Sequence, residues 1–102
     1  MSKRLAFLEK LTQEGSKDPL AWYGLALEYA SADRIDDAVA TFTKLKAIDP
    51  AYVPMYLMAG QHLAKHGRKD DARAWLTEGI AQAKKVGNTH ALGEMEGVLA
   101  TL

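Results

Sequence analysis

The feature that most constrains this chain is an internal repeat with a period of 34 residues. When the sequence is shifted by 34 positions, the segment 34–38 (RIDDA) falls onto the segment 68–72 (RKDDA). The same offset, without a gap, also pairs Ala30 with Ala64, Ala40 with Ala74, Thr43 with Thr77 and Ala47 with Ala81. Periods of this length are typical of repeat proteins, in which each repeat is one small helical or stranded unit that stacks on the next.

Apolar residues within each repeat follow a helical period. One stripe with spacing i, i+3, i+4, i+7 consists of Trp22, Leu25, Ala26 and Tyr29, and a second consists of Ala38, Val39, Phe42 and Leu45. This spacing predicts two amphipathic helices. The polar segment 31–33 separates them, with Asp33 as the expected N-cap of the second helix. The second helix is expected to end at Asp49, since proline disfavours helical geometry in the residue before it.

The second repeat and the two ends predict four more helices. In the second repeat, helices are expected over 53–66 and 69–86, ending at Gly67 and Gly87, because glycine suits the left-handed position after a helix. A further helix over 3–14 precedes the repeats, and another over 89–102 follows them. We therefore expect a single domain over 1–102, divided into an N-terminal helix (2–15), repeat 1 (19–52), repeat 2 (53–86) and a capping helix (88–102).

The repeats resemble those of the tetratricopeptide repeat family, whose pattern spans 34 residues. The residues of repeat 1 that match this pattern are Trp22, Leu25, Ala26, Tyr29, Ala38, Phe42 and Pro50. Those of repeat 2 are Tyr56, Ala59, Gly60, Leu63, Gly67, Ala72 and Leu76, with Lys84 in place of the closing proline. The resemblance implies an all-α fold, a short right-handed α-solenoid of antiparallel helix pairs with about six helices. It also implies that these matching residues pack the helices together.

Charge and composition exclude several classes of partner. The chain has 13 basic and 13 acidic residues, and a division after Tyr52 gives 7 basic with 8 acidic residues, then 6 with 5. Neither half has the strong field that nucleic acid or an anionic membrane would require. Because cysteine is absent, disulfides, a thiol nucleophile and cysteine-bound zinc are excluded. With no export signal or long apolar run, we expect a cytoplasmic protein.

No arrangement of residues points to catalysis, so we expect a protein that is not an enzyme and needs no cofactor. The acidic pairs at 36–37 and 70–71 fall in the first turns of helices, where negative charge complements the helix dipole. His62 and His66 share a helix face and are spaced to chelate a metal, and His90 could approach them in space. The better interpretation is a pair of solvated histidines at a helix end, without a metal site.

The family resemblance also implies which residues face a ligand. In each repeat the first helix lines the concave side, and its ligand-facing positions correspond here to Leu20, Tyr23, Leu27, Leu57, Gln61 and Lys65, with Met95 from the end helix. These residues predict an apolar groove that binds a peptide or an amphipathic helix of another protein. Tyr23 and Leu27 occupy places where a carboxylate clamp would begin, so no such clamp is expected.

Two alternatives to an open peptide-binding groove stay open at this point. In the first, a terminal helix of the chain itself would cover the groove. In the second, the protein would form a homo-oligomer through the groove or through its end helices. Self-assembly is suggested by Phe7, which lies outside the Leu5/Leu8 stripe. Trp75 is expected either on the outer face, partly exposed, or packed on the C-terminal helix, with a slight preference for packing.

Overall fold

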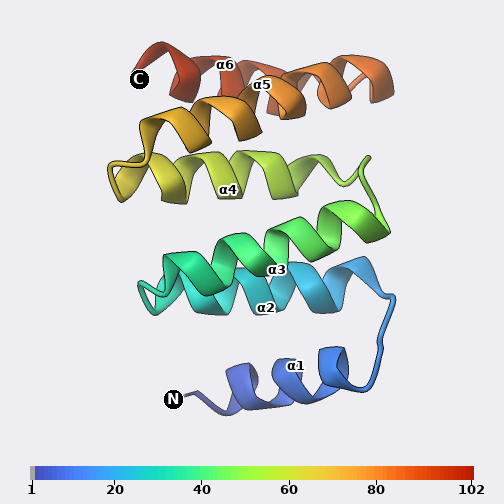
Figure 1. The fold of residues 1–102 in the computed structure, drawn as a ribbon. Helices are drawn as coiled ribbons and strands as arrows, with labels where there is room; N and C mark the ends of the chain where they lie inside the picture. Colours follow the sequence, from blue (N-terminus) through green and yellow to red (C-terminus); the bar gives the residue numbers. More distant parts are fainter. Residues whose placement is uncertain (1) are drawn as a thin grey trace. The chain divides into compact units, whose positions relative to one another are not determined.

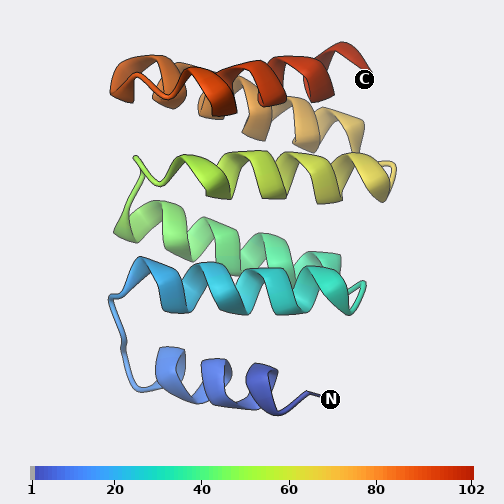
Figure 2. The same cartoon turned by 180° about the vertical axis from the view of Figure 1, so that it is seen from behind.

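The structure, a computed structural model, describes residues 2–102, which contain six helices and no strand. They are α1 (Lys3–Gln13), α2 (Pro19–Ser31), α3 (Ile35–Ile48), α4 (Val53–Lys65), α5 (Lys69–Val86) and α6 (Thr89–Ala100) (Figure 1). The expected all-α class and number of helices are confirmed. The chain divides after Asp49 into two compact units, one with α1–α3 and one with α4–α6. Within each unit consecutive helices run antiparallel (Figures 1 and 2).

Three of the helices begin at a polar side chain that caps their first turn. The Ser2 hydroxyl accepts a hydrogen bond from the Leu5 N–H at 3.0 Å, and the Asp18 carboxylate accepts one from the Leu20 N–H at 3.0 Å. The Asn88 side chain accepts the Ala91 N–H at 3.0 Å, which confirms the predicted start of α6. Each bond satisfies a backbone donor that has no partner inside the helix.

The junction between α2 and α3 differs from the expectation. Asp33 does not cap α3; it adopts φ 59°, and Arg34 at the N-cap position makes no side-chain cap bond. Gly67, which corresponds to Asp33 in the second repeat, has φ 76°. Both residues therefore supply the left-handed turn after a helix, a conformation that aspartate tolerates better than most residues other than glycine. Aspartate is common both as a helix N-cap and as a left-handed turn residue, and the sequence alone did not distinguish the two. The prediction that Asp33 caps α3 was therefore wrong.

In the first unit, α2 packs against both α1 and α3. Leu5 and Leu8 of α1 form a buried cluster with Leu25 of α2. Ala26 of α2 and Phe42 of α3 are fully buried. The apolar stripes predicted from sequence thus do form packing surfaces, and the small Ala26 side chain leaves room for large neighbours.

In the second unit, α4 contacts both α5 and α6, and α5 contacts α6. The three helices meet at Gly79 of α5. A Cβ atom there would lie 2.3 Å from Cβ of Tyr56 and 2.6 Å from Sδ of Met95, closer than van der Waals contact allows. Both of those side chains are fully buried. Glycine is therefore required at this position by the close approach of α4 and α6.

Within residues 2–102, none of the helices has both the length and the apolar character needed to cross a bilayer.

Candidate binding surfaces

One candidate surface is a face of α2 formed by Leu20, Tyr23 and Leu27, here called the Leu20 face. Their spacing of i, i+3 and i+7 places the three side chains on one side of the helix. Leu20 is 65% exposed, one of the most exposed large apolar side chains of the described chain, whereas Tyr23 and Leu27 are half-buried. The sequence prediction thus identified residues of α2 that share a face and are accessible to solvent.

The predicted ligand-facing residues of the second unit differ in accessibility. On α4, Leu57 is 8% exposed, Gln61 is half-buried and Lys65 is exposed. Met95 of α6 is fully buried, with its sulfur atom against Gly79. This corrects the assignment of Met95 to a ligand-facing position, because its side chain fills the contact between α5 and α6.

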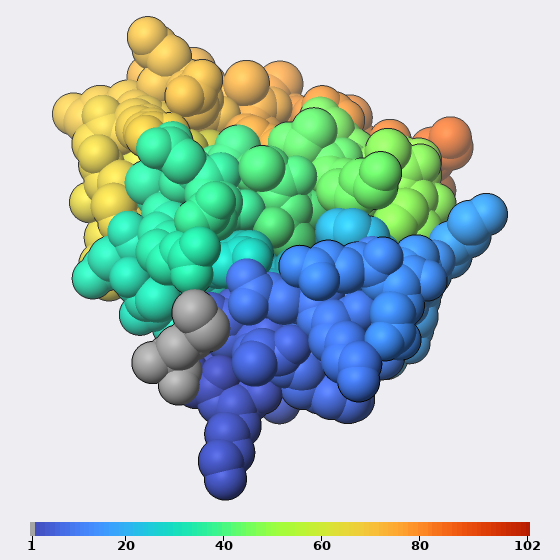
Figure 3. All heavy atoms as spheres, turned by 60° about the horizontal axis from the view of Figure 1, so that its bottom comes forward, coloured from blue at the N-terminus to red at the C-terminus, as the bar shows by residue number. Residues whose placement is uncertain are grey.

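A second candidate surface lies on the other side of α2. At about 100° per residue, Trp22, Leu25 and Tyr29 point away from the Leu20 face. Two adjoining hollows bounded by α1 and α3 have volumes of about 400 and 590 Å³. Trp22 lines both of them, and Leu25 and Tyr29 line the smaller one. The hollows share the lining residues Thr12, Trp22 and Lys44, and together they are called the α1–α3 hollow here. Figure 3 looks onto the first unit with α1 in dark blue and α3 in green.

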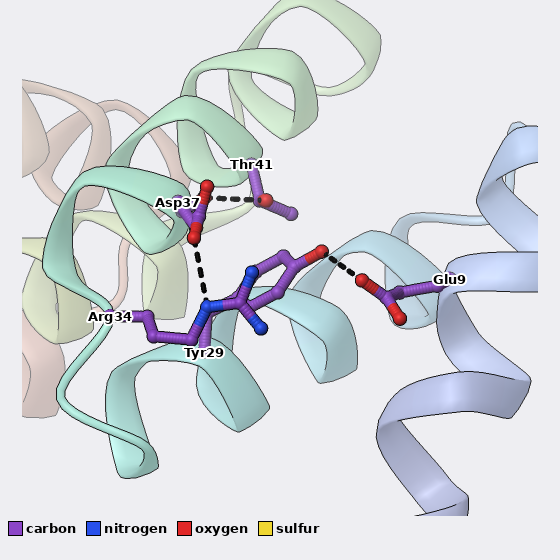
Figure 4. Close-up of polar contacts among 5 residues, drawn as sticks. All are labelled: Glu9, Tyr29, Arg34, Asp37 and Thr41. Atoms are coloured by element: carbon purple, nitrogen blue, oxygen red, sulfur yellow. Dashed lines mark hydrogen bonds and ion pairs between the residues drawn. The ribbon is translucent and has the colours of Figure 1, made fainter. Parts of the chain in front are cut away.

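One end of the α1–α3 hollow carries a closed set of polar contacts around Tyr29 (Figure 4). The Tyr29 hydroxyl donates a hydrogen bond to Oε2 of Glu9 at 2.6 Å, which links α2 to α1. The Arg34 guanidinium lies over the Tyr29 ring at 4.6 Å from its centroid, and its Nε donates to Asp37 at 2.9 Å. Partial burial, and then the hydrogen bond to Glu9, raise the pKa of Tyr29 to about 12. The polar side chains at this end therefore bond to one another within the unit, although among the described residues only Asp37 has a cationic partner.

The other end of the hollow is basic. Lys17 and Lys44 line it together with Trp22 and the aliphatic side chains of Ala47 and Ile48. The Trp22 indole N–H donates to the Ser16 carbonyl at 2.7 Å, so the polar edge of the ring is already satisfied. Among residues 2–102, no ion pair or hydrogen bond engages the side chain of either lysine. This end of the hollow thus combines an aromatic floor with two free positive charges.

In the second unit, the two positions that correspond to Trp22 and Thr41 both hold aromatic side chains. Tyr56 takes the place of Trp22, and its hydroxyl donates to the Pro50 carbonyl at 2.5 Å, the counterpart of the bond from Trp22 to Ser16. Trp75 takes the place of Thr41 and packs on Tyr56, with ring centroids 6.0 Å apart. Trp75 is only 9% exposed, so the alternative of a partly exposed tryptophan is not what the structure shows.

The α1–α3 hollow was missed in the sequence analysis, because its floor consists of residues that match the family pattern and were assigned to packing alone. A signal for it was available in the repeat alignment. At the offset of 34, a small Thr41 stands opposite a large Trp75. In repeat 2 the large Trp75 packs beside Tyr56, whereas in repeat 1 the small Thr41 takes up less room beside Trp22. This difference in side-chain volume is the signal that repeat 1 has space next to Trp22.

His62 lies in the last turn of α4, and His66 is the C-cap of that helix. Nδ1 of His66 is 2.8 Å from the carbonyl oxygen of His62, so this nitrogen is directed at the backbone of its own helix. In the part of the chain that the structure describes, no three histidine or acidic side chains come together as a metal-binding group.

Solved structures with the same fold include two proteins of bacterial origin. The chain is 32% identical to a tetratricopeptide repeat domain protein from Salinibacter ruber, with a TM-score of 0.73, over 82% of this chain and 93% of that one. A solution structure of the same protein gives a TM-score of 0.74 at 32% identity, covering 82% and 85% of the two chains. A protein from Bordetella parapertussis covers 99% of this chain and 88% of its own at 24% identity, with a TM-score of 0.84. No protein-family model matches the chain, and no curated protein matches it.

Proposed function

This chain belongs to the tetratricopeptide repeat family, a fold that generally mediates protein–protein interaction, and on that premise we propose that it is a non-catalytic module that binds a peptide or an amphipathic helix of another protein. The observation that carries the proposal is the Leu20 face of α2. Its first residue is 65% exposed, and the other two are half-buried.

The chemistry of this face suits a helical or extended apolar ligand. An amphipathic helix presents anchors at i, i+3 or i+4, and i+7, which pair with apolar side chains spaced along a partner helix. Tyrosine is a favourable anchor since it buries a large area with little loss of side-chain entropy. With few repeats to contribute contacts, we expect affinities in the micromolar range, about 8 kcal/mol of binding free energy.

The proposal is tested with two charge substitutions on the face. Leu20→Asp alters a residue that is mostly in solvent, so the fold is retained, and Leu27→Asp places a charge at the C-terminal end of the face. Partners captured from the native host by the unmodified protein are expected to be lost with both variants. Val86→Ser, at an apolar residue 51% exposed at the end of α5, is the control and is expected to capture the same partners. Unchanged capture by both aspartate variants would contradict the proposal.

A second candidate function is self-assembly as a structural unit. It is favoured by Phe7 on α1, which is 62% exposed and lies apart from the buried Leu5 and Leu8. Light scattering over a wide concentration range tests it. A dimer that Phe7→Ser abolishes would support assembly through the end helix, whereas a dimer abolished by Leu27→Asp would support assembly through the Leu20 face. A monomer at all concentrations would exclude both.

A further inference from the structure

We propose that the α1–α3 hollow is a second binding site, separate from the Leu20 face, and that it accepts an aromatic side chain with neighbouring carboxylates from a short segment of a partner protein. The site belongs to the first unit alone. It does not depend on the proposed function of the Leu20 face, because the two surfaces lie on opposite sides of α2.

The preference for an aromatic ligand follows from a comparison of the two repeats at the positions of Thr41 and Trp75. In the second unit, the indole of Trp75 packs on Tyr56, with ring centroids 6.0 Å apart and planes tilted by 51°. In the first unit the corresponding floor residue is Trp22, and the position of Trp75 holds the smaller Thr41, which lines the smaller of the two hollows together with Trp22. The second unit thus shows that an aromatic side chain can pack on the ring at this floor position. Aromatic pairs in this tilted arrangement are favourable beyond the area that they bury.

The preference for negative charge follows from the lysines at the rim. Lys17 and Lys44 line the hollow beside Trp22. The acidic side chains at the opposite end, Glu9 and Asp37, are engaged by Tyr29 and Arg34. Arg34 offsets the charge of Asp37, whereas the neutral Tyr29 hydroxyl leaves Glu9 charged, so among the described residues two lysines stand against one unpaired carboxylate in the hollow. The net charge of the hollow is therefore positive, and it is concentrated at the lysine end, which favours a ligand with carboxylates next to its aromatic group.

The size of the hollow favours a short segment. The larger of its two parts has a volume of about 590 Å³, within the usual range of ligand pockets. Along α3 the lining runs from Asp37 to Ile48, a length of about 16 Å at ~1.5 Å per residue. An extended chain covers that length with about five residues. A tryptophan flanked by aspartates fits both the length and the charge.

The experiment is a titration of isotope-labelled protein followed by NMR, with a capped tetrapeptide of the sequence aspartate, tryptophan, leucine, aspartate. We expect shifts in the amides of the lining residues Thr12, Ser16, Trp22 and Lys44. A peptide with alanine for tryptophan, and one with lysines for aspartates, are each expected to bind about tenfold more weakly or not at all. Absence of shifts in the lining amides, or equal binding of the three peptides, would overturn the proposal.

Substitutions in the protein test the same site, with the peptide kept unchanged. Thr41→Trp installs the residue that the second unit has at this position, and Ala47→Leu narrows the hollow with a residue that favours helix; both are expected to abolish binding. The double change Lys17→Gln/Lys44→Gln is expected to weaken binding about fivefold, and less in high salt, since rim charges are screened. The matched control is Lys84→Gln/Lys85→Gln in the last turn of α5, where no loss is expected.

Two further comparisons separate this site from its rivals. Leu20→Asp is expected to leave peptide binding unchanged, so failure of the proposed function on that face does not affect this result. If Leu20→Asp abolished binding instead, the peptide would occupy the Leu20 face and the present proposal would be wrong. Indole-3-acetate is expected to bind more weakly than the peptide; tighter binding of this small molecule would identify the hollow as a metabolite site and would overturn the assignment to a partner segment.

Discussion

Gly79 has no room for a larger side chain, because Tyr56 of α4 and Met95 of α6 both pack against its Cα. We predict that Gly79→Ala lowers the free energy of unfolding by about 1–3 kcal/mol, the usual cost of forcing an extra methyl group into a packed core. The matched control is Gly93→Ala in α6, where an added Cβ meets no atom within 4 Å. There alanine should raise the free energy of unfolding by about 0.5–1 kcal/mol, since glycine weakens helices. Urea titrations of both variants provide the measurement; equal effects would show that the close approach at Gly79 is absent.

Asp33 and Gly67 occupy equivalent turns after α2 and α4, and both have a positive φ. An added Cβ at Gly67 meets nothing within 4 Å, so any cost there arises from its φ of 76° alone. Gly67→Ala should destabilise the protein by about 1–2 kcal/mol. Gly67→Asp should cost less, because the first repeat already places aspartate in this conformation. Thermal unfolding of the two variants compares them directly, and a larger loss with aspartate would contradict the equivalence of the two turns.

Single residues also show where sequence reasoning reaches its limit. The period of the pattern was sufficient to place Ala26, Phe42 and Leu76 in the core, since those positions are set by helical spacing. It was not sufficient for Met95, because the end helix has no repeat partner that fixes which of its faces is buried. Nor did it identify the α1–α3 hollow, because an open space depends on the volumes of side chains from three helices at once.

Among the helices, the contact between α1 and α2 has a polar component that responds to pH. The Tyr29 hydroxyl must be protonated to donate to Glu9, and its pKa is raised to about 12 from the model-compound value of 10.0. A raised pKa in the folded state means that the stabilisation is fully present below pH about 10, and is lost as the pH rises from about 10 toward 12. Alkaline pH should therefore weaken the attachment of α1 to α2.

NMR of labelled tyrosine rings measures this directly. In the unmodified protein we expect one tyrosine to titrate near pH 12 and Tyr29→Phe to remove that titration. Glu9→Gln should bring the same titration to lower pH, because the carboxylate is replaced by a neutral acceptor and its charge no longer opposes ionisation. A normal pKa for Tyr29 in the unmodified protein would mean that the hydrogen bond to Glu9 is not formed.

The ends of five of the six helices were predicted from sequence to within about two residues. Pro50 and Gly87 end α3 and α5 as expected, and the ends of α1, α4 and α6 fall within about two residues of their expected places. These boundaries follow from local chemistry, which a sequence displays. Of the two candidate binding faces of α2, only one was predicted. The Leu20 face followed from the family resemblance, whereas the face with Trp22 was assigned entirely to packing.

For the whole chain, the expectation of a single domain remains a proposal that unfolding can test. Each compact unit has about 50 residues, a size at which an isolated core is marginal. We therefore predict one cooperative transition. Each unit holds one tryptophan, Trp22 in the first and Trp75 in the second, so Trp75→Phe leaves a fluorescence probe in the first unit and Trp22→Phe leaves one in the second. For each variant, fluorescence and circular dichroism should give the same urea midpoint. Separate midpoints would show that the units unfold independently.

If the Leu20 face contacts another protein in the cell, a photo-crosslinking amino acid in place of Leu20 should capture that protein when living cells of the native host are irradiated. We predict a discrete crosslinked product at this position that is lost when Leu27→Asp is added. The same crosslinker at Val86, a comparably exposed apolar site, should give no such product. Equal products at the two positions, or persistence of the product with Leu27→Asp, would show that the Leu20 face is not the contact surface.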